Sequence, residues 1–215
     1  TLSEMESIFR KITGDKDNPP LCCSDIVRER FLEGEREACL RKLLIRDFGS
    51  YLCKLHAVPG QESVYTDSKI IRINKASIFV NGMFSNYADI IDESKADETG
   101  DWRNEKQGVP KYAIDFKTFL RLIPAPDKNI EIRLDVYRYP MRDKDEELEL
   151  QDEHHKNIVN YAAALYFFDN DADQRDEEKG TRLMSMFNRA YGPQISTEAV
   201  RNSAVSRIHT IKKWY

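Results

Sequence analysis

The first candidate for chemistry is an acidic run in the C-terminal third of the chain, Asp169-Asn-Asp-Ala-Asp173. Carboxylate and amide oxygens in this alternation begin the calcium loop of an EF-hand. That loop also needs glycine at its sixth position for a sharp turn and a bidentate glutamate at its twelfth. Here those positions hold Gln174 and Gly180. We therefore predict an acidic turn between two helices that caps the second helix, and no calcium site.

A second candidate is the pair His154-His155, which follows Glu153 and suggests metal ligands. Adjacent residues on a helix point about 100° apart, so both imidazoles cannot reach one ion from a regular helix. No HExxH motif is present, and the other histidines, His56 and His209, fall in a predicted strand and in the C-terminal segment. The pattern favours polar residues at the start of a helix.

Motifs for nucleophilic catalysis and phosphate binding are also missing. The chain has nine glycines but neither GxSxG nor a glycine-rich phosphate loop. Of the four cysteines, Cys22 and Cys23 are adjacent and Cys39 and Cys53 stand apart, which is not the spaced CxxC pair of a zinc knuckle. We predict reduced, mostly buried thiols in a protein assembled in a cytoplasm. We also predict no metal, no cofactor and no enzymatic activity.

Composition indicates a folded, highly charged protein of one ordinary or two small domains. The chain has 215 residues, of which 40% are hydrophobic and 33% charged. The net charge of −4 gives no overall bias toward nucleic acid. Residues 193–215 carry a net charge of +3, so the rest of the chain carries −7. No apolar run is long enough to span a bilayer, and the polar, acidic start at Thr1–Glu6 is not expected to be a secretory signal.

Helical periodicity dominates both ends of the chain. Ser3 and Glu6 form a predicted capping box for a helix that ends at Gly14, and Ser24 is predicted to cap a second helix that runs to about Ile45. Near the other end, apolar spacing predicts helices from about residue 153 to 168 and from about 174 to 190. Seven acids in residues 143–153 precede the first of these, where the helix dipole favours negative charge.

The middle of the chain changes to the alternation typical of strands. Short strands are predicted around 51–55, 71–73 and 78–80, with turns at Val58–Gln61 and Asn81-Gly82. Residues 83–107 are ambiguous: residues 83–91 are compatible with a short helix, and residues 92–107, with Trp102, resemble a charged surface loop. The clearest strands, 119–123 and 130–136, are predicted to form a β-hairpin that ends at Pro140.

This layout predicts an α+β fold. A helical bundle is formed by N-terminal helices in residues 1–50 and C-terminal helices in residues 141–192. Residues 51–140 form an inserted antiparallel β-sheet or sandwich, and residues 193–215 form an extended tail.

The tail combines basic and large apolar side chains. Arg207, Lys212 and Lys213 are interleaved with Ile208, Ile211, Trp214 and Tyr215, which are unfavourable to leave in water. The composition favours docking on an acidic or mixed partner surface. Disorder and contact with nucleic acid remain alternatives.

Several short motifs occur in an order that resembles a known family, the head-to-tail adaptor (connector) proteins of short-tailed bacteriophages that include tail tubular protein A. They cover about residues 20–192 and end with the helix terminus from Phe187 to Gly192. The others are Pro59-Gly60 before Tyr65, Lys69-Ile-Ile-Arg-Ile73, Trp102 before Gly108-Val-Pro110 and Tyr112, Leu122-Ile-Pro-Ala-Pro-Asp127, Val136-Tyr-Arg-Tyr-Pro140, and His154-His155 before Tyr161–Ala164.

The resemblance implies a non-enzymatic virion protein at the head–tail junction, assembled in the host bacterial cytoplasm. It implies a ring of twelve subunits beneath the portal, with a helical bundle around the DNA channel and a β-rich part toward the tail. The implied partners are the portal protein, a tail or nozzle protein, other copies of the chain, and genomic DNA that passes without sequence-specific binding. No membrane partner is expected.

In this family the C-terminal segment reaches into the portal. By position and character, the portal-binding residues here would be Arg201, Arg207, Ile208, Ile211, Lys212, Lys213, Trp214 and Tyr215. The acidic body would suit a conduit, since negative walls do not hold DNA. Two other functions stay open: a tail-tube or neck protein that does not contact the portal, and a DNA- or host-binding protein.

Overall fold

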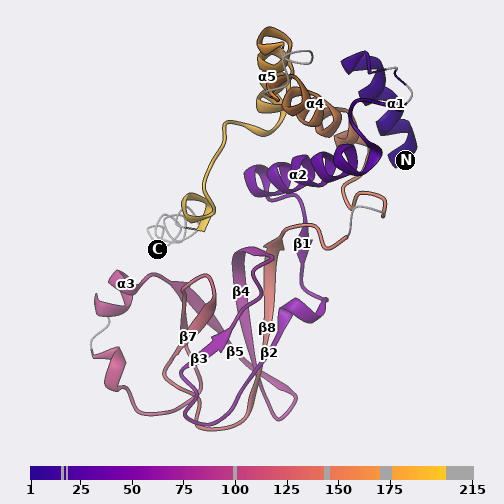
Figure 1. Ribbon diagram of the computed structural model, residues 1–215. Coiled ribbons are helices and arrows are strands. Elements are labelled where there is room, and N and C mark those ends of the chain that lie inside the picture. The colour runs from indigo at the N-terminus through magenta and orange to yellow at the C-terminus, as the bar shows by residue number, and fades with distance from the viewer. Residues whose placement is uncertain (16, 18, 99–100, 143–145, 170–175, 202–215) are drawn as a thin grey trace. The chain divides into compact units, whose positions relative to one another are not determined.

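The computed structural model describes residues 1–15, 17, 19–98, 101–142, 146–169 and 176–201 (Figure 1). The described chain divides into two compact units. We call the described residues of 1–45 and 139–195 the helical unit, and those of 46–138 and 196–201 the sheet unit. The predicted α+β class is confirmed. The four segment boundaries drawn from the sequence stay a prediction.

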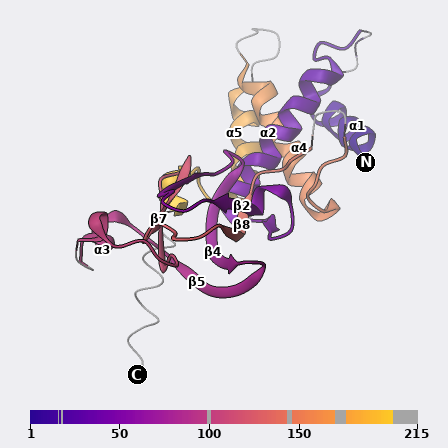
Figure 2. The ribbon, with the colours of Figure 1, turned by 90° about the horizontal axis from the view of Figure 1, so that it is seen from below.

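The helical unit is built around one central helix. Its members are α1 (Leu2–Thr13), α2 (Ser24–Lys42), α4 (Asp152–Phe168) and α5 (Glu177–Tyr191). Helix α4 packs against each of the other three, and Figure 2 shows it beside α2 and α5. Phe9, Phe31, Ile158 and Phe187 are fully buried in this unit. The expectation that N- and C-terminal helices share one bundle is therefore confirmed.

A glycine in the middle of α2 allows the close contact with α4. A Cβ atom at Gly34 would lie 3.1 Å from Tyr161 Cδ1 and 3.3 Å from Ile158 Cγ2. Glycine weakens a helix by about 1 kcal/mol relative to alanine. Here it removes the side chain that would hold the two helices apart.

Gly14 ends α1 as predicted, but other helix ends differ from the predictions. The capping box is formed by Thr1 and Glu4 rather than Ser3 and Glu6, because the helix begins one residue into the chain. Helix α2 has Cys23 at its N-cap, and it ends at Lys42 because Leu43 adopts the left-handed conformation with φ of 55°.

The sheet unit contains eight strands among its described residues, and they form one curled sheet. The sheet order is β1-β8-β4-β5-β6-β7-β3, and β2 also pairs with β8 (Figure 1). The strands are β1 (Arg46–Asp47), β2 (Lys54–Ala57), β3 (Ser63–Tyr65), β4 (Ile70–Val80), β5 (Met83–Ile91), β6 (Tyr112–Asp115), β7 (Phe119–Ile123) and β8 (Ile130–Arg138).

The predicted hairpin between β7 and β8 is wrong. Strand β7 pairs with β6 and β3, whereas β8 pairs with β1, β2 and β4. Alternating apolar residues fix which face of a strand is buried, but they carry no information about the neighbouring strand.

Three further predictions in this unit are corrected. Residues 83–91 form strand β5 instead of a helix, and the two strands expected at 71–73 and 78–80 are one bulged strand, β4. Residues 51–53 form a 3₁₀ turn, η1 (Tyr51–Cys53), before β2 begins. The turns at Val58–Gln61 and Asn81-Gly82 are confirmed, with φ of 79° at Gly60 and 76° at Gly82.

The sheet is mixed rather than antiparallel, because β5 and β6 run parallel. A parallel pair needs a long crossover, and residues 92–111 supply it. They contain α3 (Glu93–Glu98) and η2 (Trp102–Asn104), so the predicted surface loop has structure. Trp102 is buried, and its indole N–H donates to Asp97 Oδ1 at 2.8 Å.

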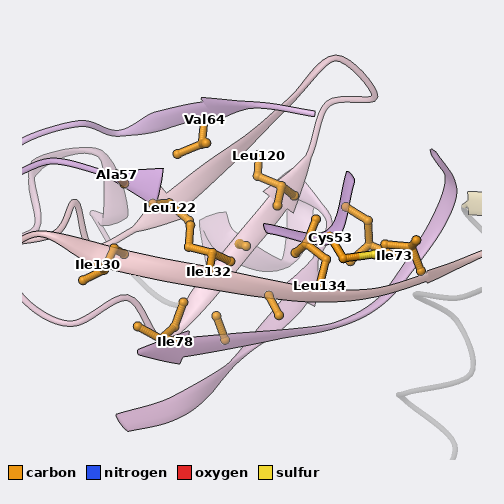
Figure 3. Packing of buried hydrophobic residues seen from close by; sticks show 14 of the residues in the cluster. Cys53, Ala57, Val64, Ile73, Ile78, Leu120, Leu122, Ile130, Ile132 and Leu134 are labelled. Atoms are coloured by element: carbon orange, nitrogen blue, oxygen red, sulfur yellow. The ribbon is translucent and has the colours of Figure 1, made fainter. Parts of the chain in front are cut away.

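One apolar cluster fills the inside of the curled sheet. Figure 3 shows Leu120 and Leu122 of β7 meeting Ile132 and Leu134 of β8 there. Each of these side chains is at most 2% exposed, and burial of one such side chain stabilises a fold by about 1.5–3 kcal/mol.

Candidate functional site

The two histidines of α4 turn toward different partners. His154 Nδ1 lies 2.9 Å from the Tyr191 hydroxyl, and His155 Nε2 lies 3.2 Å from the Leu150 carbonyl oxygen. Burial raises the pKa of Tyr191 to about 12, so its hydroxyl stays protonated at neutral pH. The pair therefore holds the start of α4 against α5 and the preceding segment, as predicted for structural residues.

No group of histidines, cysteines and carboxylates in the described part of the chain could hold a metal ion. From the acidic run first examined, Asp169 pairs with Arg30 of α2, whereas Asp171 and Asp173 lie outside the described residues. The four cysteines are free thiols, and all except Cys23 are buried, as predicted. Burial raises the pKa of the Cys22 and Cys53 thiols, which disfavours the reactive thiolate.

The C-terminal segment is fixed to the sheet unit at its start. Residues 197–201 form a helical turn, so this part of the predicted extended tail is not extended. The turn is closed by hydrogen bonds from Ala199 N to Ser196 Oγ and from Val200 N to the Ser196 carbonyl oxygen, both at 3.2 Å. The Val200 side chain is buried.

Arg201 is the main anchor of this turn. Its guanidinium donates to the carbonyl oxygens of Ile70 and Ile71 at 2.6 and 2.8 Å, and it pairs with Asp115 Oδ1 at 3.0 Å. The side chains of Arg201 and Asp115 are both only 11% exposed. Lys117 and Glu198 form a second ion pair, which lowers the pKa of the Glu198 carboxyl.

Arg201 therefore has a role within the chain itself. Its charge and its hydrogen-bond donors are used inside the sheet unit, where it holds the C-terminal segment in place. A contact of Arg201 with the portal stays a prediction. The other predicted portal-binding residues lie outside the described part of the chain: Arg207, Ile208, Ile211, Lys212, Lys213, Trp214 and Tyr215.

A second candidate site is an exposed aromatic surface on the β4–β5 hairpin. We define it by Phe79, Met83, Phe84 and Tyr87. Met83, Phe84 and Tyr87 are 72%, 50% and 60% exposed. The ring centroids of Phe79 and Phe84 lie 5.7 Å apart, and those of Phe84 and Tyr87 lie 4.9 Å apart.

Two cations lie over this aromatic surface. The Arg133 guanidinium is 4.0 Å from the Phe79 ring centroid, and Lys75 Nζ is 5.6 Å from that of Tyr87. Aromatic rings flanked by arginine are typical of the anchors in protein–protein interfaces. Exposed apolar side chains that cluster in this way make these residues a candidate interaction site.

Sequence reasoning missed this aromatic surface because residues 83–91 were expected to be helical. The signal was present in the turn Asn81-Gly82, which joins Phe79 to Phe84 in a hairpin and brings both rings onto one side.

None of the described helices combines the length and apolar character that a membrane span requires. No curated protein matches the chain. The family model described as "SU10 adaptor protein" matches residues 4–208, which is nearly the whole chain. The two units and the C-terminal segment therefore belong to a phage head-to-tail adaptor, and the chain is a member of the SU10 adaptor protein family.

Proposed function

We propose that this protein is a structural component of the virion that joins the portal to the tail and continues the channel for DNA ejection. Membership of a phage adaptor family supports a virion component that contacts head and tail proteins. The finer assignments are part of the proposal: a ring of twelve subunits, a short-tailed phage, assembly in the host bacterial cytoplasm, and DNA that passes without sequence-specific binding.

The observation that carries the portal assignment is the Arg201 anchor. An arginine held by Asp115 and two carbonyl oxygens fixes where the chain leaves the sheet unit. The segment that follows Arg201 therefore begins at a fixed position on the sheet unit. Seven of its residues combine charge with large apolar surface and are assigned to portal binding: Arg207, Ile208, Ile211, Lys212, Lys213, Trp214 and Tyr215.

The aromatic surface is assigned to the tail side. It belongs to the sheet unit, and its rings and flanking cations suit a partner that offers apolar and acidic groups. Portal binding and tail binding would then depend on different residues and can be separated by mutation.

The test is capture on portal rings from the same phage. The full chain and a chain that ends at Arg201 are compared, because the shorter chain keeps the whole anchor and both units. The full chain should be retained and the shorter one lost, with unchanged circular dichroism. Equal retention of the two chains would contradict the portal assignment.

A tail-tube or neck protein would give the opposite pattern. It would bind tail components through the sheet unit and leave portal rings bare with either chain.

A triple variant of the aromatic surface, F79A, F84A and Y87A, should lose tail binding and keep portal binding. Loss of portal binding in that variant, with an intact fold, would show that the two assignments are not separate.

A further inference from the structure

The helical unit carries a groove of about 350 Å³ between α1, α4 and α5. Phe167, Leu183 and Met186 give it an apolar lining. Lys156, Lys179 and Arg182 place three positive charges along the same groove. We call this site the basic groove. Its combination of apolar lining and basic rim fits an apolar side chain flanked by acids.

An unused polar group also faces the basic groove. Asn160 lines it and is 6% exposed, yet its side-chain amide makes no hydrogen bond within the described part of the chain. The amide therefore has hydrogen-bonding capacity that a partner in the groove can use. Lys156 and Arg182 likewise form no ion pair with any described residue.

The same unit presents a surface of complementary character at the start of α2. The aliphatic side chains of Leu21 and Ile26 are 57% and 44% exposed. Asp25 and Glu29 are exposed beside Ile26, one helical turn apart on the same face. We call these four residues the acidic face.

We propose that the basic groove binds the acidic face of a second copy of this chain. Ile26 or Leu21 enters the apolar lining, and Asp25 and Glu29 meet Lys156 and Arg182. Asn160 bonds to the inserted segment. Charge complementarity between the two surfaces carries the choice of a second copy as occupant.

Such a contact is heterologous, since each copy uses its basic groove toward one neighbour and its acidic face toward the other. Repetition of a heterologous contact gives a closed ring when the rotation closes. The inference rests on the proposed function, because it supplies the subunit contact of the proposed ring.

The experiment is a charge swap, read as the number of chains bound per portal ring by electron microscopy and native mass spectrometry. A groove variant, K156E and R182E, and a face variant, D25K and E29K, should each lose ring assembly. An equimolar mixture should restore it, because each changed surface then finds a complementary neighbour. A remote variant with the same charge change as the groove variant, K106E and K128E in the sheet unit, should assemble normally.

A second variant tests the amide without changing charge. N160L fills a similar space with an apolar side chain and removes an amide that bonds to no described residue of the chain. Its unfolding temperature should therefore not fall, whereas its ring assembly should weaken.

Several results would overturn the inference. They are wild-type assembly by both charge variants, failure of the mixture to recover, or unchanged assembly by N160L. These results leave the proposed function standing if the full chain still forms rings on the portal. If the unmodified chain forms no ring there, the proposed function and this inference both fail.

Discussion

At the scale of single residues, Glu35 is the most unusual group in the helical unit. It is fully buried in α2, where its Oε1 accepts a hydrogen bond from Leu150 N at 2.7 Å. Its Oε2 has no hydrogen-bond partner among the described residues. Burial raises the pKa of this carboxyl above its ordinary value of 4.5.

The raised pKa fixes the direction of the pH dependence. In the unfolded chain the carboxyl ionises near 4.5. Because the folded pKa lies above 4.5, Glu35 contributes most to stability at pH values below 4.5. The contribution is lost as pH rises through the folded pKa, since the folded state must then hold a charge out of water.

We therefore predict that E35Q stabilises the protein at pH 8. Glutamine keeps an acceptor for Leu150 N and carries no charge, so the gain should be about 1 kcal/mol at pH 8 and should shrink toward pH 4. Thermal unfolding of both proteins across that range measures it. The control E35A should be less stable than the unmodified protein at both pH values, because it leaves a cavity and a Leu150 N–H without an acceptor. A loss of stability in E35Q at pH 8 would contradict this account.

At the scale of elements, the anchored turn at residues 197–201 is the feature that most constrains the C-terminal segment. The turn is short and would be unstable alone. Its stability comes from Arg201 and buried Val200, which attach it to strands β4 and β6.

We predict that R201A releases this turn. The variant leaves the Asp115 carboxylate largely buried without its cation, which should destabilise the sheet unit by about 2–3 kcal/mol. Amide hydrogen exchange should accelerate at residues 199–201, with little change in the helical unit. R201K keeps the charge but lacks the planar guanidinium that reaches three acceptors. Its exchange rates should therefore lie between those of the unmodified protein and those of R201A. Unchanged exchange in R201A would show that the anchor is unimportant.

Elements with strong local signals could be predicted from the sequence. Helix α4 was expected from 153 to 168 and is found at Asp152–Phe168, because its apolar residues recur at the period of a helix. Strand β8 and the turns at Gly60 and Gly82 were predicted for similar local reasons. By contrast, the partners of β7 and β8 depend on residues far apart in the chain.

The segment after β5 shows the same limit. Its charged composition indicated a surface loop, but its structural role is to cross over to the parallel strand β6. Trp102 is buried there beneath two guanidinium groups, those of Arg103 and Arg121, at 4.1 and 4.9 Å from its ring. Local composition cannot reveal such a contact, because Arg121 comes from strand β7.

At the scale of the whole molecule, the chain consists of two units with separate apolar cores. The polypeptide passes from the helical unit to the sheet unit and back, and its C-terminal turn then returns to the sheet unit. The family membership assigns the protein to phage adaptors. The roles of the Arg201 anchor, the aromatic surface and the basic groove in that function are our proposals. The sequence identified the basic, aromatic C-terminal segment. It did not identify the basic groove, because the groove forms only when three helices pack.

The central claim is that the C-terminal segment beyond Arg201 attaches this protein to the portal. Cryo-electron microscopy of portal rings mixed with the full chain tests it most directly. We predict a ring of added density on one end of the portal, with ordered density for residues 202–215 in contact with portal subunits. Density that meets the portal only through the helical or sheet unit, or portal rings that stay bare, would contradict the claim.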